Sequence, residues 1–345
     1  MQLRFPGGMY GFIIKRLLQL IPIFFAVTIV VFLLLPLTGD PARQVLLGQG
    51  RQDVTPELLD NISHQYGFQR PLYIQYIRYL TGYPPADPSQ GENALWISKG
   101  LLRGDLGRSY TRSMPVLSLI ADALPQTLLL TFTAFAISLA IGVLIGIISA
   151  LRRKTWVDYT AMGGAIFGVS MPFFWQGMMM ILIFVIWLRW FPVPTAGQHG
   201  LMYLILPAVT LATHESASLA RMTRSSMLDV LRQDYVRTAR AKGLRERSVV
   251  YKHALKNAFI PIATLLFLRL PFLFGGTVIM EILFSWPGMG RLLVTAMGAA
   301  GSPAKDWFIV QGGVLMFLVL AIFANLLADI TYAYLNPKIR YGEGG

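Results

Sequence analysis

The sequence of 345 residues contains no cysteine, few charged residues and no Gly-Lys dipeptide. Without cysteine the chain forms no disulfide, thiolate nucleophile or thiolate metal site. A loop that cradles nucleotide phosphates needs Gly-Lys followed by Ser or Thr, so the chain carries no ATPase site of this kind. These absences exclude thiol chemistry and direct nucleotide hydrolysis by a P-loop.

Other enzyme motifs are also missing. The four histidines, His64, His199, His214 and His253, lie in separate segments without the spacing of metal ligands. Ser170 lacks a Gly-x-Ser-x-Gly context, and His214-Glu215 does not begin an HExxH motif. The sequence therefore predicts no catalytic residue and no metal site.

Charged residues make up only 14% of the chain and hydrophobic residues 54%, with a mean hydropathy of +0.55. A soluble domain usually has about 25% charged residues. Several apolar runs reach the roughly 20 residues that cross a bilayer. We expect an all-α polytopic membrane protein with six transmembrane helices. The expected spans are Phe12–Leu35, Leu124–Leu151, Tyr159–Leu188, Leu201–Ala220, Ala258–Leu283 and Phe308–Tyr332.

The net charge of +13 comes largely from basic clusters at one set of span ends. This is the bias of cytoplasmic loops, so it predicts a multi-pass membrane protein with both termini in the cytoplasm, and no nucleic-acid partner. The first apolar run follows Lys15-Arg16 and exceeds the 7–15 residues of a signal peptide, so we interpret it as a retained span.

The spans divide the chain into three parts. Residues 1–36 hold the N-terminus and first span, 37–123 form an extracytoplasmic segment, and 124–345 hold five helices with a basic loop at 229–256. In the long segment, Thr38-Gly39-Asp40-Pro41 signals a turn and Thr55-Pro56-Glu57 a helix start. Thr81–Lys99 is rich in Gly and Pro and predicts an irregular insertion.

Small residues and prolines recur in the spans. Gly142 and Gly146 form a GxxxG pattern, which favours close helix packing or a hinge. Pro172 and Pro271 are expected to interrupt the third and fifth spans. Near Pro172, a cluster with Met171, Phe174 and Gln176 is a candidate for an adaptable translocation path or gate, with core packing as the alternative.

Two ionisable residues, Glu215 and Arg269, fall inside expected spans. An unpaired charge there costs at least about 2.5–3.5 kcal/mol on insertion scales. We expect both to face the bundle interior, where they pair or line the path. The alternative is that Glu215 is neutral or reaches toward the inner surface.

The basic loop contains Arg237-Thr238-Ala239 followed by Gly243, and this pattern resembles the "EAA…G" loop of ABC importer permeases. Further segments resemble the B-type permease of the dipeptide, oligopeptide and nickel importers, in the same order along the chain. They are Arg16–Ala42, Gly100–Val116 (GLLRGDLGRSYTRSMPV), Leu124–Thr131 (LPQTLLLT), Glu281–Leu293 (EILFSWPGMGRLL) and Asn325–Gly342. The chain departs from the wider loop pattern at Arg237, where Glu is usual, and at Lys256, where Pro is usual.

The resemblance implies a permease subunit without its own ATPase site, moving di- or oligopeptides across the inner membrane. It implies a heterodimer with a second homologous permease, one or two ABC ATPase subunits that bind ATP and magnesium, an extracytoplasmic solute-binding protein and contact with membrane lipid. It assigns ATPase coupling to Arg237, Thr238, Ala239, Arg240, Ala241, Lys242, Gly243 and Leu244. Nickel, glutathione or another small solute is the alternative cargo, and an ion-coupled secondary transporter the less favoured alternative.

Overall fold

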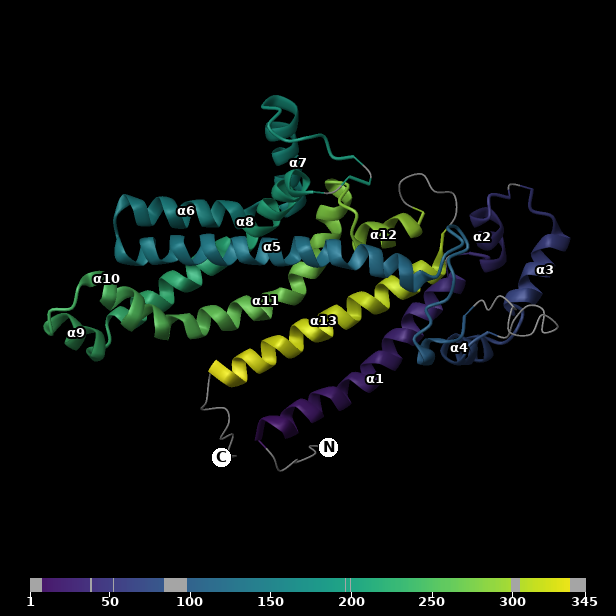
Figure 1. The fold of residues 1–345 in the computed structure, drawn as a ribbon, viewed down its shortest axis with the longest axis horizontal. Coiled ribbons are helices and arrows are strands. Elements are labelled where there is room, and N and C mark those ends of the chain that lie inside the picture. The colour runs from purple at the N-terminus through teal and green to yellow at the C-terminus, as the bar shows by residue number, and fades with distance from the viewer. Residues whose placement is uncertain are drawn as a thin grey trace. The chain divides into compact units, whose positions relative to one another are not determined.

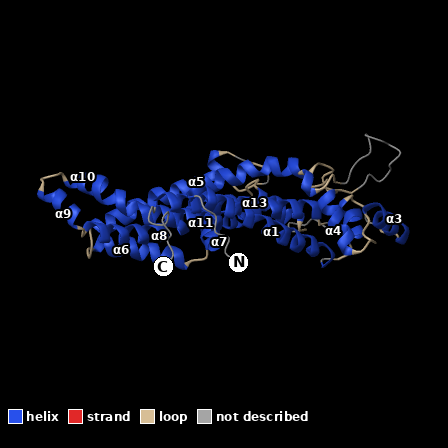
Figure 2. Cartoon of the chain, turned by 90° about the horizontal axis from the view of Figure 1, so that it is seen from below, coloured by secondary structure: helices blue, strands red, loops and turns tan. Residues whose placement is uncertain are grey.

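A computed structural model describes residues 8–37, 39–51, 53–83, 98–195, 197–198, 200–298 and 305–335. Most of the described residues are helical, the rest form turns and loops, and their only β pairing is two isolated bridges, Tyr83 with Ser98 and Arg108 with Pro115 (Figure 2). This confirms the all-α class. Most of the expected Thr81–Lys99 insertion lies outside the described residues.

The chain divides into two compact units. Unit 1 holds residues 1–16, 128–286 and 320–345, and unit 2 holds 17–127 and 287–319. Three helices contribute residues to both units: α1 (Gly8–Leu37), α5 (Val116–Leu151) and α13 (Trp307–Leu335).

Among its described residues, unit 2 also contains short helices, four between α1 and α5 and one that precedes α13. They are α2 (Pro41–Gly48), α3 (Pro56–Tyr66), α4 (Leu72–Thr81), the 3₁₀ turn η2 (Leu101–Arg103) and α12 (Met289–Ala296). The side chain of Asp40 caps α2 and that of Thr55 caps α3, each with proline at the first helical position. The helix start expected at Thr55 is therefore confirmed, and the signal at Asp40-Pro41 begins a helix.

Unit 1 is built around α8 (Leu201–Leu231), which packs against α6 (Trp156–Ser170) and α11 (Leu255–Leu283) (Figure 1). The remaining elements of unit 1 are α7 (Phe173–Met180), the π-helix η3 (Ile181–Trp187), α9 (Asp234–Ala241), α10 (Glu246–Ser248) and the π-helix η4 (Val249–Ala254). Gly142 and Gly146 of α5 lie against α8, so the GxxxG pattern marks helix packing.

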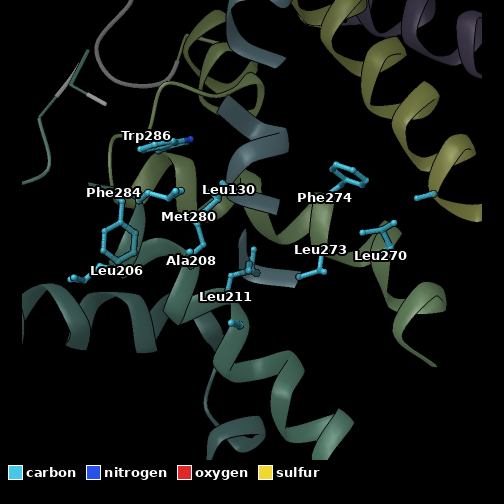
Figure 3. Packing of buried hydrophobic residues seen from close by; sticks show 14 of the residues in the cluster. Leu130, Leu206, Ala208, Leu211, Leu270, Leu273, Phe274, Met280, Phe284 and Trp286 are labelled. Carbon is cyan, nitrogen blue, oxygen red and sulfur yellow. The ribbon is translucent and has the colours of Figure 1, made fainter. Parts of the chain in front are cut away.

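The core of unit 1 is apolar and is shared by three helices. Leu130 of α5 meets Leu211 of α8 and Leu273 of α11 in one cluster (Figure 3). The same cluster includes Met280, Phe284 and Trp286 toward the end of α11. Within a bilayer such a cluster is stabilised by van der Waals contact between the helices and not by the removal of apolar surface from water.

Three described helices are long and apolar enough to cross a membrane: Val116–Leu151, Glu246–Leu283 and Trp307–Thr331. The α6 and α7–η3 pair would be a fourth span, bent by 101° at its break. The break lies at Met171-Pro172, between the end of α6 at Ser170 and the start of α7 at Phe173. The interruption expected at Pro172 is therefore confirmed.

The expected interruption at Pro271 is wrong. The helix α11 continues from Leu255 to Leu283 with both Pro261 and Pro271 inside it. Membrane helices tolerate proline where neighbouring groups satisfy the freed carbonyls. Two other helices exceed the expected spans: α5 begins at Val116 rather than Leu124, and α8 continues past Ala220 to Leu231.

Candidate functional site

The loop between α8 and α11 forms a compact helix–turn–helix. Helix α9 begins just after α8 ends, and the turn Lys242–Arg245 leads into α10 and η4 (Figure 1). Both views place α9 and α10 at one end of unit 1 (Figure 2). The basic loop read from the sequence is therefore an ordered projection of unit 1.

One face of α9 packs against the chain that follows it. Val236 and Ala239 are buried against Val249 of η4, with Val230 and Leu231 of α8 packed alongside. Small and β-branched side chains let the two segments approach closely. Ala239 therefore contributes to the loop's own fold and offers no surface to a partner.

The turn after α9 depends on Gly243. Its φ is +76°, in the left-handed region that side-chain-bearing residues rarely adopt, and a Cβ added there would meet nothing within 4 Å. Arg240 then closes the turn from outside, donating to both carboxylate oxygens of Glu246 at 3.2 and 2.8 Å. The hydrogen bonds with Glu246 raise the pKa of the Arg240 guanidinium.

The remaining predicted coupling residues form the outward face of this loop. Leu244, an apolar side chain in a polar turn, is 41% exposed. The other exposed members are Arg237, Thr238, Ala241, Lys242 and Gly243. The apolar side chain of Leu244 is flanked by the cations of Arg237 and Lys242. Such a surface is complementary to an apolar groove with acidic edges, so this face suits docking to another protein.

Sequence reasoning missed a polar cluster that joins three helices. Asp158, 2% exposed in α6, accepts hydrogen bonds from Arg224 of α8 and from the backbone N–H of Lys154. Ser149 of α5 also donates to Asp158. A lone Asp in the first turn of a helix is the only local signal, because Arg224 lies 66 residues further on. The cluster fixes the relative positions of α5, α6 and α8.

The two ionisable residues of the expected path lie on neighbouring helices. Glu215 is buried in α8, and Arg269 is half-buried in α11 with its guanidinium carbon 6.0 Å from the ring centroid of Phe272. Arg269 and His214 are the charged or ionisable neighbours of Glu215. No ion pair within 4 Å joins Glu215 and Arg269 among the described residues.

The cluster near Pro172 is split by the break between α6 and α7. Gln176 is buried and donates to the carbonyl oxygens of Gly168 and Met171, the latter at 3.2 Å. Phe174 is exposed on α7, and Met171 is half-buried at the break. Gln176 thus satisfies carbonyls that the break leaves without helical partners.

Within the described part of the chain, His, Asp and Glu do not gather in groups of three that would suit a metal ion. The ionisable groups instead form pairs and capping contacts.

Comparison with known proteins gives two family matches that follow one another along the chain. The family described as "Binding-protein-dependent transport system inner membrane component" matches residues 142–341, and its N-terminal counterpart, "Binding-prot-dependent transport system membrane comp, N-term", matches residues 9–131.

Similar curated proteins include the glutathione transport system permease protein GsiC of Escherichia coli strain K12. It is 39% identical over 334 residues, which cover 96% of this chain and 100% of that protein. The GsiC protein of Salmonella paratyphi A is 38% identical over the same coverage.

A structure of the MetNI methionine ABC transporter, in an inward-facing conformation, resembles the fold with a TM-score of 0.52 at 16% identity. The match covers 64% of this chain and 97% of that chain.

Proposed function

The chain belongs to the binding-protein-dependent transport system inner membrane component family as an ABC importer permease, and we propose that its cargo is glutathione or another short peptide. The proposed cargo rests on the 39% identity to a glutathione permease along that protein's full length. Nickel, imported by the same kind of machinery, is the second candidate cargo, as the sequence resemblance implies.

The proposed complex has a second, homologous permease beside this chain. One or two ABC ATPase subunits bind ATP and magnesium on the cytoplasmic side, and a solute-binding protein delivers cargo from the other side. We propose six spans with both termini in the cytoplasm. This orientation places α9 on the cytoplasmic side, where the ATPase subunits lie.

We propose that the outward face of α9 and its turn transmits ATPase closure to the permease. Arg237, Lys242 and Leu244 would contact the ATPase subunit, while Gly243 sets the direction of the turn. The buried side, with Ala239 against Val249, and the Arg240–Glu246 bridge support this role by holding the loop rigid. The Asp158–Arg224 cluster would carry the motion onward, because α8 leads directly into α9.

Co-purification tests the coupling surface. The tagged chain is extracted from native membranes in mild detergent, and mass spectrometry identifies the proteins that accompany it. We expect a P-loop ATPase with the native chain and with Gly243→Asn, because Asn tolerates the left-handed region. Gly243→Trp should lose the ATPase. Equal ATPase recovery with the Trp variant would remove α9 from the interface.

Uptake tests the cargo. Host cells with and without the chain are given labelled glutathione, a labelled dipeptide and labelled nickel in separate assays. Loss of glutathione or dipeptide uptake in the cells without the chain is the expected result. Loss of nickel uptake alone would assign the second cargo, and unchanged uptake of all three would reject both.

A further inference from the structure

The extracytoplasmic segment expected from the sequence contains a helix whose exposed side is apolar. The exposed side chains of α4 are Leu72, Tyr73, Ile77 and Thr81, and Tyr73 is 67% exposed. None of these carries a charge. A surface of this kind in water would be unusual for a helix of ten residues.

The preceding helix of the same unit shows what a water-facing helix looks like here. The exposed residues of α3 are Pro56, Glu57, Asp60, Asn61, His64 and Gln65, and none of these is a large apolar residue. Gly67, with φ +71°, ends α3 and turns the chain toward α4. Two short helices a few residues apart therefore present surfaces of opposite character.

Two polar side chains of α4, Gln75 and Tyr76, make hydrogen bonds on the inward side of the helix, while Arg78 is half-buried. Gln75 is buried and its amide donates to the carbonyl oxygens of Phe68 at 2.9 Å and Arg70 at 2.7 Å. Tyr76 shares a hydrogen bond of 2.9 Å with Thr28 of α1. The backbone groups in the middle of α4 are satisfied within the helix, whereas those at its two ends need polar partners, which the headgroup region of a membrane supplies.

The contact with α1 indicates the level in the membrane at which α4 lies. Thr28 and Phe32 lie inside Leu18–Leu33, the apolar stretch of α1. Phe32 is buried, with ring centroids 5.5 Å from Tyr76 and 5.9 Å from Tyr79 (Figure 1 shows α4 beside this end of α1). The helix thus packs against a part of α1 that is apolar enough to lie within the bilayer.

The same stretch of α1 also exposes apolar side chains. Ile29 and Val30, which neighbour Thr28 in sequence, are exposed, and Val30 is 58% exposed. Aromatic residues such as Tyr73 favour the boundary between headgroups and acyl chains. A short amphipathic helix at this boundary buries its apolar face in the lipid.

We propose that α4 is an interfacial membrane helix whose Leu72, Tyr73 and Ile77 face contacts phospholipid acyl chains. The segment between α1 and α5 is then partly seated in the bilayer and not wholly in the aqueous phase. Exposed Arg70, separated from α4 by Pro71, is placed to meet lipid phosphates at the membrane surface.

The absence of cysteine makes spin-label accessibility a direct test. Tyr73→Cys and Ile77→Cys are introduced singly, labelled with a nitroxide and studied in the complete transporter, reconstituted in phosphatidylethanolamine–phosphatidylglycerol nanodiscs. Collisions with oxygen, which concentrates in lipid, are compared with collisions with a water-soluble nickel reagent. The transporter with the unsubstituted chain gives the background of its other subunits.

Two further positions serve as references for accessibility to oxygen and to the nickel reagent. Val30→Cys on α1 is the lipid reference, and Glu57→Cys on α3 is the water reference. We expect oxygen accessibility to exceed nickel accessibility at positions 30, 73 and 77, with the reverse at 57. Nickel-dominated values at 73 and 77 would place α4 in water. Low access to both reagents there would place it against a protein subunit. Either result would overturn the proposal.

Discussion

Arg224 donates two hydrogen bonds of 2.7 Å, one from Nε and one from Nη2, to the two carboxylate oxygens of Asp158. This fork joins α8 to the start of α6. Lys154, in the turn between α5 and α6, has a φ of +63°, and its N–H donates to the same carboxylate at 3.0 Å. The Asp158 carboxylate is therefore the point at which three helices are joined.

Replacing Arg224 by Ala should destabilise the chain. It removes the cation from the Asp158 carboxylate, which keeps only its hydrogen bonds from Ser149 and from the N–H of Lys154, and the loss of hydrogen bonds to a charged group costs about 1.5–3 kcal/mol. Thermal unfolding of the detergent-purified chain measures the loss. Arg221→Ala is the matched control, because Arg221 is exposed one turn earlier on α8. Equal unfolding temperatures for the two variants would contradict a stabilising role of the pair.

Gly146→Ala tests the packing of α5 on α8. An added Cβ would lie 2.4 Å from the Cβ of Thr223 and 2.7 Å from the carbonyl oxygen of Ala220, so the helices must separate. Overpacking of this kind costs about 1–3 kcal/mol. Gly163→Ala on α6 is the control, since its Cβ would meet nothing within 4 Å. A lower unfolding temperature is expected only for the Gly146 variant, and equal temperatures would argue against close contact.

The helices of unit 1 were largely predictable from apolar runs, whereas their ends were not. Hydropathy falls after Ala220 because of Arg221 and Arg224, which ended the expected span there. The helix nevertheless continues to Leu231, since Thr223 and Met227 are buried on its packed side. Polar residues on one side of a helix lower its average hydropathy without ending it.

The candidate site was predictable only in part, because its details depend on packing between segments. The EAA-like pattern located α9, but the pattern does not distinguish buried Ala239 from exposed Ala241. That difference depends on Val249, which packs against α9 from beyond the turn. Asp158 and Arg224 were missed because their pairing depends on how α6 and α8 pack, which no local pattern encodes.

Gln176→Leu should destabilise the chain at the break between α6 and α7. The substitution keeps much of the side-chain volume but removes the donor to the carbonyl oxygens of Gly168 and Met171. A buried acceptor left without a partner costs about 1–3 kcal/mol. Gln176→Glu should destabilise the chain more than Gln176→Leu, because an ionised carboxylate would be buried without a donor beside two carbonyl oxygens; Phe174→Leu on the exposed side serves as the control. Unfolding of the Gln176 variants at the wild-type temperature would show that the break does not depend on these bonds.

Leu244→Ala should weaken ATPase binding without affecting the fold. Leu244 is 41% exposed in the isolated chain, so truncation removes little internal packing. If it is buried against the ATPase, its loss costs about 2 kcal/mol, which is roughly thirtyfold in affinity. The amount of ATPase that co-purifies measures this. Leu201→Ala, at the other end of α8, is the control and should retain the ATPase. Retention by both variants would exclude Leu244 from the docking surface.

Arg269→Leu should reduce transport while the complex still assembles. Arg269 is half-buried in α11, with its guanidinium carbon 6.0 Å from the ring centroid of Phe272, and the described residues give it no ion pair within 4 Å, so its replacement should cost the fold little. A charge retained inside a membrane span is expected to serve the path. Hydrogen bonds to a charged group are worth about 1.5–3 kcal/mol, so cargo uptake should fall roughly tenfold or more. The unfolding temperature and the co-purifying ATPase should stay unchanged.

The Glu215→Gln variant tests whether Glu215 also lines the path. If it does, uptake by the Glu215→Gln variant should fall as well. Wild-type uptake by that variant would mean that Arg269 acts without Glu215. Unchanged uptake by the Arg269 variant would mean that this arginine has no part in translocation.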